Sequence, residues 1–187
     1  NDRAQSEYVV RVPADSPAMQ MNVTATFTVL ESWPYTECQY FDVFPFRGVW
    51  PQDWWYDEIL FQAGDGRWKA MNTVRPSILA GDKDLSTITN GGFFALYSSD
   101  RGNMVMLTKN FDPPLPVEYC ICGNYIDYHM TEQFHGPDGK PAPPPKGFKA
   151  TMQYDLALWG NKKTSRKQLM EMGEKSIKAG KLVLPPR

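Results

Sequence analysis

The sequence has few of the residues on which catalytic, metal and disulfide sites most often depend. Among its 187 residues are two histidines and three cysteines. It contains no glycine-rich phosphate loop, no His-Glu-x-x-His, no Gly-x-Ser-x-Gly and no Cys-x-x-Cys. Three cysteines cannot all pair within one chain, and Cys120 and Cys122 stand too close in sequence for a bridge of normal geometry. A disulfide scaffold is therefore excluded, and no specific catalytic signature remains.

The sequence also lacks long hydrophobic runs and a strong net charge. No stretch approaches the roughly 20 apolar residues that cross a membrane as a helix. The formal net charge is −1, which gives no general reason to expect a polyanionic partner. The first residues are polar and do not resemble a signal peptide. We therefore expect neither nucleic acid nor a membrane as partner. We expect a location that is extracellular or periplasmic after signal removal, or else cytoplasmic.

Aromatic and strand-forming residues are abundant instead. Hydrophobic residues make up 42% and charged residues 22%, as in soluble globular proteins, while aromatics reach 13%. Aromatic side chains suit flat, half-buried surfaces, which favours a sheet-rich fold. We expect residues 1–160 to form one β domain, and residues 161–187 to form a helix and tail that belong to it or begin a linker. The basic residues of 161–187 alternate with Glu at helical spacing, which is typical of a solvated helix face.

Alternation of apolar and polar residues is the dominant local signal, and it is typical of strands. In Asn22–Val29 the valines, the alanine and the phenylalanine share one face, and three threonines share the other. The Pro- and Gly-rich run His135–Gly147 is predicted to be a loop. Further strands are predicted at Tyr8–Val12, Cys38–Phe46, Val117–Ile121, Tyr125–Phe134 and Lys149–Trp159.

Two hairpins are predicted from short turns between strand signals. Tyr56–Gln62 and Arg67–Asn72 flank a Gly-Asp-Gly turn. Phe93–Tyr97 and Met104–Thr108 flank a second turn and are apolar on both faces, as expected where a sheet is covered on both sides.

A single helix is predicted near the end of the sequence. Ser165 and Gln168 form a capping-box signature, and Gly180 suits the C-cap. About ten strands and one late helix predict an all-β fold, an antiparallel β-sandwich with one C-terminal α-helix, with a barrel as the alternative. The apolar stripe of the helix is supplied by Leu169, Met172 and Ile177.

The run GVWPQDWWYDE, residues 48–58, is the best candidate for ligand binding. Trp50, Trp54 and Trp55, with Arg47, lie in a Pro-broken connection, where exposed aromatics can stack on a sugar ring. Adjacent residues in a strand face opposite sides, so at least one of Trp54 and Trp55 is expected to fill the core instead. The sequence therefore predicts a carbohydrate-binding surface built from Trp50, Trp54, Trp55 and Arg47.

Three residues are candidates for acid–base catalysis: His129, Asp53 and Glu58. Asp57 and Glu58 are adjacent and cannot form a glycosidase pair together, whereas Asp53 with Glu58 is geometrically possible. His129 is suited to proton transfer near neutral pH. Its predicted carboxylate partners are Asp127 and Glu132.

We expect no metal and no cofactor. Asp127, His129 and His135 share one face of a predicted strand, but the two histidines lie about 20 Å apart in an extended chain, too far for one ion. Cys120 and Cys122 also share a face, where free cysteines most often act as small buried hydrophobes.

Two stretches resemble β-sandwich domains of carbohydrate-active enzymes. The run NGGFFALYSSDRGNMVMLTKN, Asn90–Asn110, resembles the hairpin of domains related to galactose mutarotase, in which a Gly-Gly-aromatic run leads into a long central strand. The run Tyr154–Leu182 resembles the end of such a domain, where a last strand is followed by a helix leading to another module. The resemblance implies a sandwich fold that handles sugars, and it assigns no catalytic residue.

Three functional hypotheses follow. The first is a β-sandwich domain that binds carbohydrate or acts on it, associated with glycoside hydrolysis or polysaccharide degradation. The second is a stand-alone glycoside hydrolase or lyase that uses His129 and nearby carboxylates. The third is a non-catalytic assembly module that packs against another domain, or forms a homo-oligomer, through its C-terminal helix.

Overall fold

The computed structural model describes most of the chain, in segments separated by short and long gaps. Within these segments the chain forms ten strands and one helix. The predicted strand at Cys38–Phe46 lies outside the described residues. The described segments are residues 3–16, 18–32, 57–62, 66–72, 86–88, 92–100, 102–112, 117–122, 125–129, 137–140, 142–161 and 163–185.

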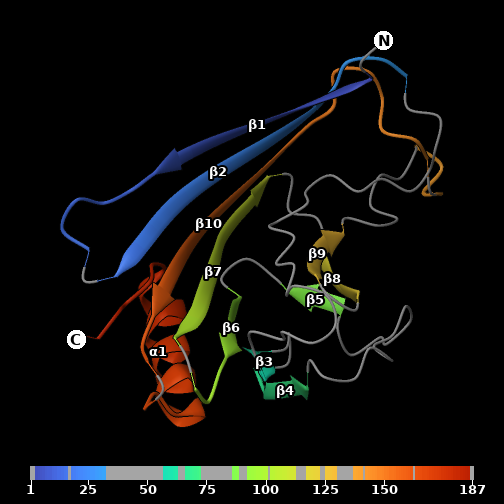
Figure 1. Cartoon of the computed structure of the whole chain (residues 1–187). Coiled ribbons are helices and arrows are strands. Elements are labelled where there is room, and N and C mark those ends of the chain that lie inside the picture. The colour runs from blue at the N-terminus through green and yellow to red at the C-terminus, as the bar shows by residue number, and fades with distance from the viewer. Residues whose placement is uncertain are drawn as a thin grey trace.

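Seven of the described strands form one antiparallel sheet (Figure 1). β1 and β4 are its two edges, and the long strands β2, β10 and β7 run through its centre. The strands in spatial order are β1 (Ala4–Arg11), β2 (Met19–Val29), β10 (Lys149–Trp159), β7 (Asn103–Asp112), β6 (Phe93–Tyr97), β3 (Glu58–Gln62) and β4 (Trp68–Asn72).

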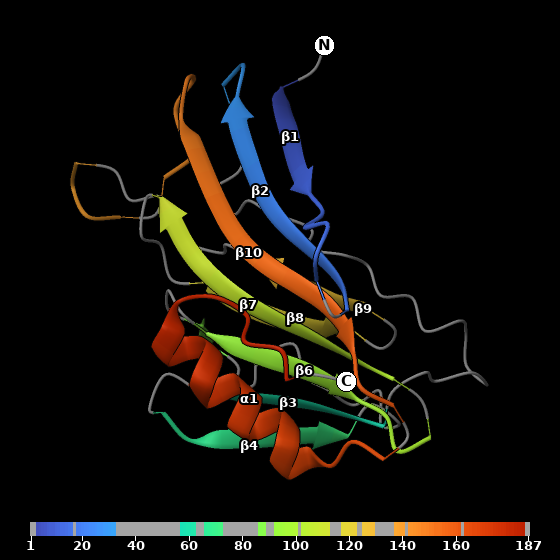
Figure 2. The same ribbon diagram turned by 90° about the vertical axis from the view of Figure 1, so that its left-hand side faces the viewer.

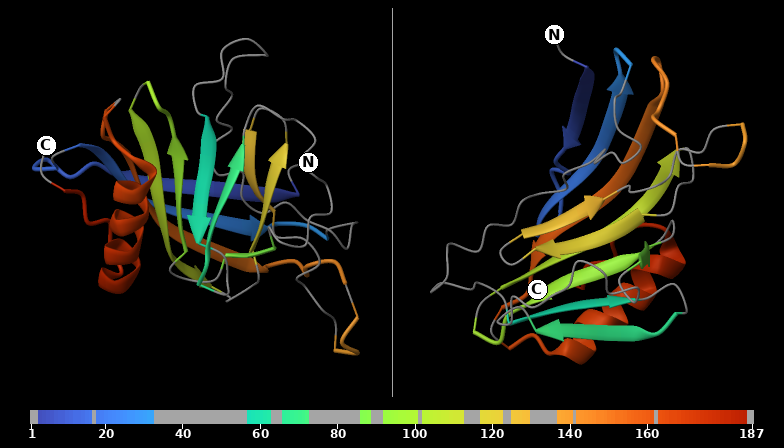
Figure 3. Two further views of the ribbon diagram at one scale, coloured as in Figure 1. Left: turned by 90° about the horizontal axis from the view of Figure 1, so that it is seen from below. Right: turned by 90° about the vertical axis from the view of Figure 1, so that its right-hand side faces the viewer.

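The other three described strands form a small antiparallel sheet in the order β5 (Ser86–Ile88), β8 (Val117–Cys122) and β9 (Tyr125–His129). This sheet and the helix α1 (Arg166–Ala179) lie on opposite sides of the seven-stranded sheet (Figures 2 and 3). The described chain is therefore layered as helix, large sheet and small sheet. An all-β fold with one C-terminal helix is confirmed, while the sandwich itself stays a prediction.

The local predictions for β2 and for both hairpins are confirmed. Val23, Ala25 and Phe27 on β2 are buried, while the threonines between them are only partly buried. β3 pairs antiparallel with β4, and β6 pairs antiparallel with β7. Phe93 and Phe94 are adjacent on β6 and both are buried, so the sheet is covered on both faces at this point.

The helix begins and ends where its capping residues predict. The Ser165 side chain accepts from the Gln168 backbone N–H, and the Gln168 side chain accepts from the Ser165 N–H, so the capping box is complete. Gly180 closes the helix with a φ of 63°, a left-handed conformation that favours glycine.

The apolar side of α1 packs on the sheet of its own chain. Leu169 and Met172 join a buried cluster with Phe93, Val105 and Leu107. The assembly hypothesis has this helix pack against another domain or a second copy, and Leu169 and Met172 at the centre of its stripe are buried within the chain. The other buried members of the cluster are Leu60, Ala95, Ala157 and Leu182.

Gly173 allows α1 to lie close to the sheet. A Cβ at this position would overlap the Trp68 ring and lie 2.6 Å from Cδ1 of Phe93. Trp68 and Phe93 themselves meet edge to face, with ring centroids 5.9 Å apart. The helix therefore uses a glycine, despite its low helix propensity, because no larger residue fits against these two rings.

Asp155 is a charged residue buried in the centre of the large sheet. Its carboxylate lies 2.8 Å from the Lys109 ammonium and accepts from the Asn22 side-chain amide at 2.5 Å. Its second oxygen accepts from the Leu182 backbone N–H at 3.3 Å. These partners come from β7, β2 and the segment after α1, so one side chain links both halves of the sheet to the chain beyond the helix. A buried carboxylate needs such partners, because its desolvation is otherwise costly.

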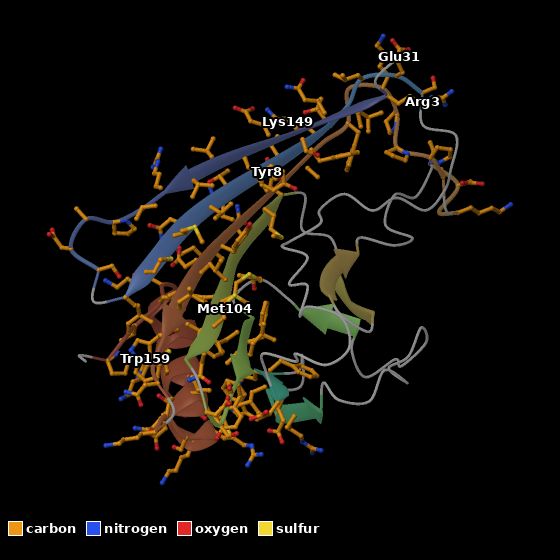
Figure 4. The ribbon with its side chains drawn as sticks, viewed as in Figure 1. Arg3, Tyr8, Glu31, Met104, Lys149 and Trp159 are labelled. Carbon is orange, nitrogen blue, oxygen red and sulfur yellow. The ribbon has the colours of Figure 1, made fainter. Side chains whose placement is uncertain are left out.

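Trp159 makes a second connection to the segment after α1. It stands at the end of β10, near the helix (Figure 4), and its indole N–H donates to the Pro185 carbonyl at 3.3 Å. The side chain is only partly buried and packs against the cluster beneath the helix.

Candidate functional site

One corner of the large sheet gathers charged and aromatic side chains, among them Asp57 and Glu58, the last two residues of the run GVWPQDWWYDE. We call Asp57, Glu58, Tyr97, Ser99 and Arg166 the Glu58 corner. Glu58 is the first residue of β3 and lies opposite Tyr97, the last residue of β6. Arg166 is the first residue of α1, and Ser165 fixes the start of that helix. The corner is thus built by a strand start, a strand end and a capped helix start.

Glu58 and Arg166 form a bidentate ion pair. Arg166 Nε lies 2.5 Å from Glu58 Oε2, and Arg166 Nη2 lies 2.7 Å from Glu58 Oε1. The guanidinium carbon lies 5.2 Å from the centroid of the Tyr97 ring, within reach of a cation–π interaction. The pKa of Arg166 is raised, chiefly because its side chain hydrogen-bonds to Glu58 and is attracted by that carboxylate. Both oxygens of Glu58 are therefore engaged by one permanent cation.

Asp57, directly before β3, is hydrogen-bonded to the end of β6 and to the turn that follows it. Its backbone N–H donates to the Tyr97 carbonyl at 2.7 Å, and its Oδ2 accepts from the Ser99 N–H at 2.7 Å. The neighbouring turn is fixed by Asn103, whose side-chain oxygen accepts from the Ser98 N–H at 2.9 Å. Asp57 and Glu58 thus bind different groups, Asp57 the Ser99 N–H and Glu58 the Arg166 guanidinium.

All four predicted ligand-binding residues lie outside the described residues. Glu58 is the one predicted catalytic residue whose side chain is described, and it occupies the corner as the partner of Arg166. Sequence reasoning missed Arg166 because it follows Glu58 by 108 positions, a separation that no local pattern bridges. Arg47, Trp50, Asp53, Trp54 and Trp55 lie outside the described residues.

His129 is the last residue of β9 and is paired across the small sheet. Its Cα lies opposite that of Glu118 on β8, and Asp127 lies opposite Cys120. The register therefore makes Glu118 the carboxylate-bearing residue directly across from His129, a pairing that sequence reasoning missed because it depends on strand register. Glu132 and His135 lie outside the described residues.

Trp68 has a structural role in the described part of the protein. It packs edge to face on Phe93, and its indole N–H donates to Glu174 of α1 at 3.3 Å. This tryptophan therefore fixes the helix on the sheet.

Searches for metal sites and membrane spans in the described residues found neither. No group of three His, Cys, Asp or Glu residues in these segments is arranged to hold a metal ion. No helix in the described part of the chain is both long and apolar enough to cross a membrane.

No family model matches the sequence, and neither a curated protein nor a solved structure matches it at the significance we required. The resemblance to domains related to galactose mutarotase consequently stays a prediction.

Proposed function

We propose that this chain is a carbohydrate-binding domain whose binding surface forms at the Glu58 corner. One observation carries the proposal: the tryptophan-rich run continues in the sequence into Asp57 and Glu58, which belong to a hydrogen-bonded cluster of charged and aromatic groups. Sugar sites combine an aromatic ring, which covers the apolar face of the pyranose, with charged groups that bind hydroxyls. Tyr97, Arg166 and Ser99 supply groups of both kinds in the corner.

Covalent geometry limits how far the tryptophans can lie from this corner. Trp55 precedes Asp57 by two residues, so its Cα lies within about 7 Å of the Asp57 Cα. Trp54 lies within about 11 Å by the same limit. Asp57 itself is held to Tyr97 and Ser99 by hydrogen bonds of 2.7 Å. The Cα atoms of both tryptophans are therefore limited to about 11 Å from that of Asp57, which supports a shared binding surface.

A binding role is favoured over catalysis at the corner. Glycoside hydrolysis needs one carboxyl group that donates a proton and a second that acts as base or nucleophile. Both carboxylate oxygens of Glu58 accept hydrogen bonds from Arg166, and the Asp57 carboxylate accepts from the Ser99 backbone N–H. These carboxylates are positioned to hold the corner together and to present Arg166 beside Tyr97. Association with glycoside hydrolysis or polysaccharide degradation then depends on a catalytic partner or module.

The proposal is tested by a glycan array followed by calorimetry on the polysaccharides that bind. We expect Trp55→Ala or Trp54→Ala to weaken affinity at least about tenfold, the loss of roughly one stacked aromatic ring. Arg166→Ala should weaken it by a smaller factor. Trp68→Phe is the control, because Trp68 packs on Phe93 and α1, and it should lower stability while leaving affinity unchanged. A folded protein with no affinity for any polysaccharide would contradict the proposal.

An acid–base role for His129 is the second candidate. The strand register favours it, because Glu118 and His129 are Cα partners across β8 and β9, and a histidine with a nearby carboxylate residue suits acid–base chemistry. Turnover of a polysaccharide panel should be lost in both His129→Ala and Glu118→Gln, with melting temperatures nearly unchanged. Full turnover in His129→Ala would exclude this role.

A further inference from the structure

The two edges of the large sheet differ in how they are protected. β4 is five residues long, carries Lys69 and is tied to α1 through Trp68. β1 is eight residues long, seven of them exposed, and it contains neither lysine nor proline. Its register with β2 is also unbroken by a bulge. Long edge strands without such interruptions are templates for pairing with another strand.

Exposed apolar residues of β1 lie on both faces of the sheet. Tyr8, Val9 and Val10 have exposed fractions of 45%, 44% and 49%. Tyr8 and Val10 share one face, and Val9 lies on the other with the charged residues Glu7 and Arg11. Tyr8 stands on β1 at the outer edge of the sheet (Figure 4).

The backbone direction of β1 follows from one hydrogen bond at its start. The Arg3 carbonyl accepts from the Leu30 N–H at 2.9 Å, so Arg3 directs its backbone groups toward β2. Backbone groups alternate in direction along a strand, so the odd-numbered residues of β1 bond to β2 and the even-numbered residues face outward. A strand that pairs with β1 must therefore meet Ser6 and Val10 at hydrogen-bonding positions.

The charges of β1 select one register for pairing with a copy of itself. A twofold axis at Glu7 or at Arg11 would oppose like charges, and an axis at Tyr8 would oppose Glu7 to Val9. An axis at Val9 places Glu7 of each copy opposite Arg11 of the other. This register also lets the outward-facing, even-numbered residues exchange backbone hydrogen bonds.

We propose that β1 pairs with β1 of a second copy of this chain, antiparallel and centred on Val9. The occupant is a second copy because the strand is complementary to itself in charge, hydrogen bonding and apolar contact. Val9 and the Glu7–Arg11 pairs fall at non-hydrogen-bonded positions, where opposed side chains are closest. The neighbours of Glu7 and Arg11 on β2 are Thr26 and Asn22, so neither has a charged residue opposite it there. Pairing joins the two large sheets into one.

Sedimentation velocity of the full chain over a range of concentrations tests this proposal. The wild type should form a dimer that dissociates on dilution. Glu7→Arg and Arg11→Glu should each weaken dimerisation about tenfold or more, because two attractive pairs become repulsive. An equimolar mixture of these two variants should regain the dimer, since each Arg then meets a Glu. Asp138→Arg, an exposed charge reversal outside β1, is the control and should leave dimerisation unchanged.

Two further variants test the strand and its register. Val10→Pro removes an outward N–H and keeps the β1–β2 hydrogen bonds, so it should give a monomer with a nearly unchanged melting temperature. Val9→Cys places two thiols across the twofold axis, with Cα atoms about 4.5 Å apart, and should form a disulfide-linked dimer on oxidation. Ser6→Cys should not, because its counterpart lies at the far end of the paired strands.

A wild type that stays monomeric at every concentration would overturn the proposal. A wild-type dimer that persists undiminished in Glu7→Arg, Arg11→Glu and Val10→Pro would also overturn it, because the dimer would then use another surface. A mixture of the charge variants that dimerises no better than either alone would exclude the register centred on Val9.

Discussion

The two sides of the seven-stranded sheet are stabilised differently. On the covered side (β6, β3 and β4) α1 lies over one face, and residues such as Phe93 and Leu169 are fully buried. On the open side, β1 contributes no buried residue, and Tyr8 and Val10 are about half exposed. The covered side therefore supplies the core that holds the fold, while the side chains of β1 on the open side remain exposed.

The long strands β2 and β10 join these two sides. One face of β2 is buried through Val23, Ala25 and Phe27, whereas its threonines on the other face remain partly exposed. Asp155 on β10 bonds to Asn22 on β2, to Lys109 on β7 and to Leu182 in the segment after α1. We call Asp155 and its three partners the junction. Mutations on either side of the sheet and at the junction test the contrast between the two sides.

The largest expected effect is a truncation beneath the helix. Leu169→Ala removes a fully buried side chain from the cluster that α1 forms with the sheet, and it should lower the free energy of unfolding by about 3 kcal/mol. Val9→Thr on β1 is the matched control and should change it by less than about 0.5 kcal/mol. Urea denaturation at low protein concentration measures both. Equal losses would show that the two sides contribute equally to stability.

The second prediction concerns the junction. Asp155→Ala leaves the Lys109 ammonium and the Leu182 N–H without their acceptor, and it should cost about 2 kcal/mol. The matched control is Glu31→Ala at an exposed ion pair with Lys146, which should cost less than about 0.5 kcal/mol. The double variant Asp155→Ala with Lys109→Met should recover part of the loss. Strict additivity in the double variant would contradict an interaction between the two side chains.

The third prediction is a loss of stability at alkaline pH. The pKa of Tyr154 on β10 is raised, first by burial and then by the nearby Tyr8. The Tyr154 hydroxyl therefore keeps its proton to a higher pH in the folded state than in the unfolded state. Its contribution to the free energy of unfolding is complete below pH 10 and declines above it. About 1 kcal/mol should be lost between pH 10 and pH 11. Denaturation curves at the two values should show a smaller loss in Tyr154→Phe, and an unchanged loss would contradict the raised pKa.

The smallest expected effect is at the Glu58 corner. Arg166 is more than half exposed, so Arg166→Ala should lower the free energy of unfolding by about 0.5 kcal/mol despite the bidentate pair. Lys167→Ala, which loses a longer contact of 3.9 Å with Glu171, should have still less effect. Thermal unfolding compares the two. A loss above about 2 kcal/mol for Arg166→Ala would make the corner part of the core that holds the fold.

Local chemistry made much of the fold predictable. Alternation identified β2 and the buried face of Val23 and Phe27, and the capping residues Ser165 and Gly180 fixed both ends of α1. Each of these signals depends on residues within a few positions of one another. The spatial order β1-β2-β10-β7-β6-β3-β4 depends instead on pairings between distant strands, and no sequence pattern encoded it.

The candidate site was predictable only in part for the same reason. Glu58 was singled out as a carboxylate, but its partner Arg166 lies on the helix, and the ion pair changes the role expected of it. Asp155 stands in the apolar run DLALW and was passed over, although an acidic residue among hydrophobic ones indicates a buried pair. The exposed edge of β1 follows from strand order, which the sequence alone does not provide.

The partners of Asp155 also bear on the order in which the chain folds. All contacts of its carboxylate are made only when Asn22, Lys109 and Leu182 have reached their places beside β10. The contact with Asn22 spans 133 positions of the sequence. Contacts of such sequence separation form late, because the loop between them must first be closed. During synthesis, Leu182 leaves the ribosome after every strand of the sheet. The last contact of this carboxylate therefore forms after translation of all the strands, which ties completion of the sheet to the arrival of the segment after α1.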